Sequence, residues 1–161
     1  MDKKTKILRI VFSITTLLLL VYIFGHSLMN ANDSDNESDT VLYIVNSIIH
    51  IFNLDITLVS HIIRKSAHFI EFMVLGISFY FMYYSYKFSN LKRSILTILS
   101  GAFVAVIDEL IQNFSVGRSC ELRDMLIDFA GVLVSTLVLF IIFYFIDRKK
   151  KLKNDGSDQR K

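Results

Sequence analysis

Residues 124–146, DMLIDFAGVLVSTLVLFIIFYFI, decide the fold class of this protein. From Phe129 to Ile146 this stretch contains no charged residue. An α-helix rises about 1.5 Å per residue, so about 20 residues cross a hydrocarbon core about 30 Å thick. A helix that is apolar on all sides is stable only where lipid or other helices surround it. The stretch therefore predicts a transmembrane helix.

Three further apolar stretches of similar length lie at 8–28, 67–86 and 94–113. Over the whole chain 53% of the residues are apolar and the mean hydropathy is +0.48, too apolar for a water-soluble domain. The chain contains no proline, which favours uninterrupted helices. We therefore expect an all-α polytopic membrane protein, with a four-transmembrane-helix bundle in a membrane domain at 1–146 and a tail at 147–161.

The lysines and arginines predict how these helices are oriented. Segments 1–9, 87–93 and 147–161 carry four, three and seven of them, together fourteen of the eighteen in the chain. Because short loops rich in lysine and arginine stay on the cytoplasmic side, we expect both termini and the basic tail to be cytoplasmic. This orientation requires an even number of spans. No small-x-small cleavage site follows the first apolar stretch, so we expect that stretch to be retained as a signal anchor.

The segment at 29–63 is predicted to be an external loop, because it carries five acidic residues and no lysine or arginine. Its second half, 41–63, is apolar but is interrupted by polar residues such as Asn46, His50 and Asp55. Polar groups at this density are costly in a lipid-exposed span. We therefore expect an interfacial or re-entrant helix within this loop. A fifth span over 41–63 is the alternative.

Charge and cysteine content restrict the partners and cofactors. The net charge of +3 and the pI of about 9.0 would suit nucleic acid, but the basic residues stand at the ends of apolar stretches rather than along one polar face. We expect the lipid bilayer as a partner and no nucleic acid. Cys120 is the only cysteine, which excludes an intrachain disulfide and a CxxC metal site. We expect no cofactor and no bound metal.

The remaining charged residues of the membrane domain gather near the predicted outer ends of the helices. The four basic residues there are Arg64, Lys65, Arg118 and Arg123, and the six carboxylates are Glu71, Asp108, Glu109, Glu121, Asp124 and Asp128. Arg64, Lys65, His68 and Glu71 are spaced so that they lie along one stripe of a helix. Glu71 is one to two turns deeper than Arg64, where a lone carboxylate is costly, so we expect it to have a partner.

The next two predicted helices carry the same kind of pattern. Asp108, Glu109 and Gln112 stand at three- and four-residue spacing, and Arg118 follows in a turn at 116–119. Asp124 and Asp128 then lie one helical turn apart. The helix dipole alone can explain Asp124, which stands in the first turn. Asp128 is too deep for that explanation.

Three segments carry a resemblance to a known family. RKSAHFIEFMVLG (64–76), DELIQNFSVGR (108–118) and RDMLIDFAG (123–131) resemble, in this order, the VanZ-like family. The resemblance implies a bacterial cell-envelope membrane protein with a link to resistance to the glycopeptide antibiotic teicoplanin, and it implies no particular reaction. One position departs from the expected pattern: Phe72 stands where tyrosine is expected at least as often.

Three functional hypotheses remain open, and we favour a binding protein over an enzyme. In the first, the outer cluster binds an anionic, lipid-linked or cell-wall-related ligand, with arginine and lysine contacting phosphate. The residues expected to contact it are Arg64, Lys65, His68, Glu71, Asp108, Glu109, Gln112, Arg118, Asp124 and Asp128. In the second, a metal-dependent or acid/base enzyme acts on a phosphorylated lipid, with His68, Glu71, Glu109 and Asp128 as catalytic candidates. In the third, the cluster only joins the helices through ion pairs.

Overall fold

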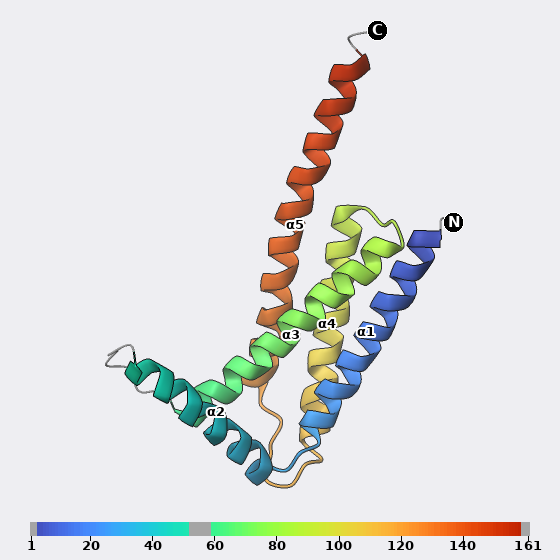
Figure 1. Ribbon diagram of the computed structural model, residues 1–161. Helices are drawn as coiled ribbons and strands as arrows, with labels where there is room; N and C mark the ends of the chain where they lie inside the picture. The colour runs from blue at the N-terminus through green and yellow to red at the C-terminus, as the bar shows by residue number, and fades with distance from the viewer. Residues whose placement is uncertain (1–2, 52–58, 159–161) are drawn as a thin grey trace.

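The computed structural model describes residues 3–51 and 59–158, and every regular element in these ranges is an α-helix. The helices are α1 (Lys3–Ser27), α2 (Ala31–Ile51), α3 (Ser60–Ser85), α4 (Asn90–Gln112) and α5 (Leu122–Asp158) (Figure 1). The all-α prediction is therefore confirmed.

Four of these helices, α1, α3, α4 and α5, are long and apolar enough to cross a membrane, as predicted, so the chain is a multi-pass membrane protein. α3 and α4 begin several residues before the apolar stretches. α4, for example, begins at Asn90 rather than at 94, and the side chain of Ser89 accepts a hydrogen bond from the backbone N–H of Lys92. Hydropathy marks only the part of a helix that suits lipid, whereas polar residues continue the same helix beyond it.

α2 begins ten residues earlier than the helix that we expected within 41–63. The side chain of Asn30 caps it by accepting the backbone N–H of Asp33, and Asp33 places a negative charge in the first turn. The acidic run that we assigned to loop is therefore helical. α2 is not among the candidate spans; it starts at the end of the bundle and runs outward alongside the first part of α3 (Figure 1). Residues 52–58, the middle of the predicted interfacial helix, lie outside the described residues.

The bundle is held together by close contact between α3 and α5. Phe72 and Leu75 of α3 and Val132 of α5 are fully buried. Gly131 of α5 lies directly against the backbone of α3: a Cβ atom at this position would collide with the carbonyl oxygen of Phe69 and stand 2.9 Å from the backbone nitrogen of Met73. Glycine at this crossing therefore permits an approach that no other residue would allow.

The helix ends and connecting segments lie at two opposite ends of the bundle. α1 begins and α5 ends at the same end of the bundle, whereas α2 and the loop at 113–121 lie at the opposite end (Figure 1). The first helical turns of α3 and α5 also lie at the α2 end (Figure 1). The motif residues of three separate segments are consequently brought to one end of the molecule.

Candidate functional site

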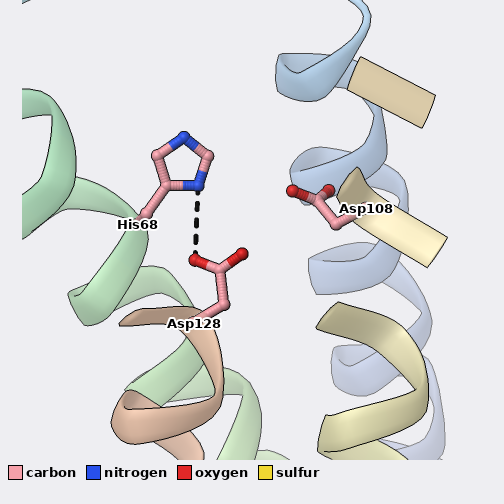
Figure 2. Close-up of side chains that lie close together, drawn as sticks. All are labelled: His68, Asp108 and Asp128. Atoms are coloured by element: carbon pink, nitrogen blue, oxygen red, sulfur yellow. Dashed lines mark ion pairs between the residues drawn. The ribbon is translucent and has the colours of Figure 1, made fainter. Parts of the chain in front are cut away.

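Three buried side chains from three different helices meet between the helices at the α2 end. They are His68 of α3, Asp108 of α4 and Asp128 of α5, of which 6%, 0% and 0% of the surface is exposed. A ring nitrogen of His68 and one oxygen from each carboxylate all lie within 4.8 Å of one another. Figure 2 shows the two carboxylates and the ring arranged around a common space.

Asp128 and His68 lie at ion-pair distance, which gives an ion pair when the imidazole is protonated, but no hydrogen bond joins them. The His68 Nδ1 atom lies 3.5 Å from Asp128 Oδ1. Neither carboxylate oxygen of Asp128 receives a hydrogen bond from any residue that the structure describes, and the same holds for His68 Nδ1. A fully buried carboxylate with both oxygens unpaired is unusual, because an unpaired buried charge is costly.

Asp108, by contrast, is held firmly. The hydroxyl of Ser27 on α1 donates to Oδ1 at 2.5 Å, and the amide of Gln112 donates to Oδ2 at 2.9 Å. The carbonyl oxygen of Ser27 also accepts a hydrogen bond from the Ser115 hydroxyl at 2.9 Å. The end of α1 is thereby joined to α4 and to the loop that follows it.

Glu109 is fully buried but faces a different part of the site. Its Oε2 atom accepts the backbone N–H of Glu121 at 2.8 Å, which fixes the loop just before α5 begins. Its Oε1 atom has no partner among the described residues. Glu109 is thus a loop-anchoring residue in this structure and does not join the group around Asp128.

Arg118 is a half-buried cation without a carboxylate partner. Its guanidinium donates to the Ser34 hydroxyl at 2.6 Å and to the Ser27 carbonyl oxygen at 3.4 Å, and no carboxylate of the described residues forms an ion pair with it. Burial lowers the pKa of the Arg118 guanidinium, and the charge of Arg64 lowers it further, which is partly offset by Asp108. The carboxylates around Arg118, those of Asp108, Asp35 and Glu109, therefore offset only part of the cost of its charged form.

A cavity of about 90 Å³ lies between Arg118 and the N-terminal turns of α3 and α5. Its lining residues are Ala31, Arg64, His68, Gln112, Gly117, Arg118, Ser119, Glu121 and Asp124. His68 belongs both to this cavity and to the buried group with Asp108 and Asp128.

Glu71, for which we expected a partner, meets His26 of α1. The two groups are 3.7 Å apart, and the other ring nitrogen of His26 lies 3.1 Å from Glu37 of α2. These residues line a separate cavity of about 390 Å³ between α1, α2 and α3. The rings of His26 and His68 are 6.3 Å apart, so the two regions are neighbours.

Arg64 and Lys65 are already neutralised within the chain. Lys65 Nζ lies 2.7 Å from Asp124 Oδ1, and this pair joins α3 to the first turn of α5. Arg64 lies 2.7 Å from Asp35 of α2. Two of the three cations expected to contact a ligand therefore have carboxylate partners.

Several residues of the site were not anticipated from the sequence. His26, Ser27 and Ser34 belong to none of the motifs. His26 and Ser27 end an apolar helix and Ser34 lies in a polar, acidic run, and residues at such positions commonly face water. A second correction concerns the opposite end of the bundle, outside the site: Arg93 was assigned to the loop at 87–93, but it lies inside α4 with 3% of its surface exposed, stacked on Tyr84. The early start of α4 explains this correction.

Comparison with known proteins identifies the family. Searches of the curated proteins and of the solved structures found no significant match. The family model VanZ/LLP1 matches residues 12–144, a range that contains all three motif segments and every side chain of the buried group. Because this match covers most of the chain and agrees with the resemblance of the motifs, the protein belongs to the VanZ/LLP1 family.

Proposed function

We propose that this VanZ-family protein binds an anionic, phosphate-bearing ligand of the bacterial cell envelope at the cavity lined by Arg118. The ligand is a lipid-linked or cell-wall-related molecule, and its binding lowers susceptibility to glycopeptide antibiotics such as teicoplanin. The observation that carries this proposal is that the two guanidinium groups lining the cavity differ in whether a carboxylate pairs with them. Arg64 is paired with Asp35, whereas Arg118 has no carboxylate partner among the described residues.

The donors around the cavity suit a phosphate group. A guanidinium presents a planar fork of N–H groups that binds two oxygens of one phosphate. Gln112 also lines the cavity; it donates one amide N–H to Asp108, and a glutamine amide has a second N–H to donate. A volume of about 90 Å³ is equivalent to a few water molecules, so it suits a headgroup rather than a whole lipid.

The expected orientation places this cavity outside the cell. The lysine- and arginine-rich segments gather at the end of the bundle where α1 begins and α5 ends, and such segments stay in the cytoplasm. The opposite end, with α2 and Arg118, would then face the outer leaflet.

Charge removal at Arg118 tests the proposal. We expect Arg118→Ala to accumulate in the membrane and to melt in detergent close to the wild-type temperature, because no carboxylate among the described residues loses an ion pair and the Ser27 carbonyl keeps its hydrogen bond from Ser115. The same variant should lose both retention of a polyprenyl phosphate probe and any teicoplanin tolerance in a sensitised bacterial host. Arg123→Ala is the matched control. This substitution removes the same charge from an exposed arginine near the start of α5 that does not line the cavity.

The proposal fails if Arg118→Ala keeps full probe binding and tolerance, or if it loses them only because the protein does not accumulate. For Lys65 and Asp124 a structural role has better support, since each neutralises the other across two helices.

A further inference from the structure

We infer that His68, Asp108 and Asp128 form a binding site for one divalent metal ion, Zn²⁺ or Mn²⁺, beneath the Arg118 cavity. Each residue comes from a different helix, and all three are at least nine-tenths buried. Their candidate ligand atoms converge within 4.8 Å on the common space seen in Figure 2. This inference does not depend on the anionic ligand, because an ion can be held whether or not Arg118 contacts a phosphate.

The charge of the group calls for a cation. Asp108 and Asp128 are both fully buried, and no lysine or arginine in the described ranges forms an ion pair with either. With both carboxylates ionised, the group carries two negative charges if the imidazole is neutral and one if it is protonated. Ionised groups inside a membrane protein are costly unless they are compensated. A divalent ion bound by two carboxylates and a neutral imidazole brings the total charge to zero.

The atoms that would bind the metal ion are not fully occupied by hydrogen bonds. Both oxygens of Asp128 and the Nδ1 atom of His68 have no hydrogen-bond partner among the described residues. Asp108 is oriented by Ser27 and Gln112, and each of its oxygens keeps a further lone pair. Hydrogen bonds of this kind commonly orient a carboxylate that binds a metal.

The ligand atoms need to move only a short way to reach the separations of a metal site. An ion at about 2.1 Å from each ligand atom places those atoms about 3.4 Å apart in tetrahedral geometry. His68 Nδ1 and Asp128 Oδ1 are already 3.5 Å apart. The largest separation in the group, up to 4.8 Å, would have to shorten by up to about 1.4 Å, which rotation of the side chains provides.

The donor set points to the class of metal. One imidazole nitrogen and two carboxylate oxygens suit Zn²⁺ or Mn²⁺, whereas Mg²⁺ prefers oxygen ligands alone and keeps most of its water. Three protein ligands leave a coordination position for water or an anion. Because His68 also lines the cavity, that position is adjacent to the space that Arg118 borders.

Metal content tests the inference directly. The full-length protein is purified in mild detergent with a histidine-free affinity tag, incubated separately with Zn²⁺, Mn²⁺ or Mg²⁺, passed over a desalting column and analysed by elemental mass spectrometry. We expect about one Zn²⁺ or Mn²⁺ per wild-type chain, little Mg²⁺, and at least about tenfold weaker retention in Asp128→Asn and His68→Gln. Glu109→Gln is the matched control, because it neutralises a buried carboxylate of α4 outside the group.

Two readouts on wild-type protein keep the test decisive if a variant fails to fold. Bound Mn²⁺ should show the electron spin echo modulation of a directly coordinated imidazole nitrogen, and Zn²⁺ should raise the melting temperature because it binds the folded state. The inference is overturned if wild-type protein retains no stoichiometric Zn²⁺ or Mn²⁺. It is equally overturned if retention is unchanged in both Asp128→Asn and His68→Gln, or if the bound Mn²⁺ shows no imidazole nitrogen.

Discussion

The Nδ1 atom of His68 on α3 lies 3.5 Å from a carboxylate oxygen of Asp128 on α5, and both residues are buried. The pair stands next to a close approach of the two helices, because Gly131 is almost one turn beyond Asp128 and rests against the backbone of Phe69. The position of the buried group is therefore set by the same crossing that packs the bundle.

Gly131→Ala should lower the melting temperature in detergent, because the added Cβ collides with the α3 backbone and overpacking costs about 1–3 kcal/mol. Gly25→Ala is the control, since a Cβ at Gly25 meets nothing within 4 Å. Both changes gain the same intrinsic helix propensity, so their difference isolates the collision. Equal melting temperatures for the two variants would mean that the crossing is looser than described.

The Lys65–Asp124 pair should contribute to stability through direct coupling. In a double-mutant cycle with alanine, measured by unfolding in a denaturing detergent, we expect a coupling energy of about 0.5–3 kcal/mol. The Arg64–Asp35 pair serves as a comparison, because the Asp35 side chain is 56% exposed and water screens its charge. Its coupling should be below about 1 kcal/mol. Strictly additive effects at Lys65 and Asp124 would exclude a structural ion pair there.

Ser27→Ala should weaken metal retention by about 10–100-fold, because this hydroxyl orients the Asp108 carboxylate. Ser94→Ala is a matched control: Ser94 is also buried, but its hydroxyl donates to the carbonyl of Asn90 near the start of α4, away from Asp108. Titration with Zn²⁺ in a competing chelator measures both variants. Unchanged affinity in Ser27→Ala would show that Asp108 needs no orienting partner.

Cys120 should be labelled from outside the cell without any mutation, since it is the only cysteine and is exposed at the α2 end of the bundle. We expect a membrane-impermeant maleimide to label the wild-type chain in intact spheroplasts. The double variant Cys120→Ser, Lys149→Cys moves the thiol to an exposed position near the other end, and it should react only after lysis. The reverse pattern would place Arg118 and its cavity in the cytoplasm.

The sequence by itself determined the number of spans and the family. Both depend on information that is local along the chain: apolar runs long enough for a bilayer, and three motif segments with recognisable spacing. It did not reveal that α2 begins at Ala31 or that Arg93 is buried in α4, because helices extend beyond the apolar stretches from which they are predicted.

Only the tertiary structure decided which of the polar residues meet. The sequence predicted that charges of three segments would gather near one end, but it could not tell that Lys65 pairs with Asp124, that Glu71 meets His26, or that Arg118 has no carboxylate partner among the described residues. These residues are far apart along the chain, and their distances depend on how the helices rotate and cross. Contact at Gly131, where one missing Cβ lets α5 reach the backbone of α3, sets that crossing and brings Asp128 to His68.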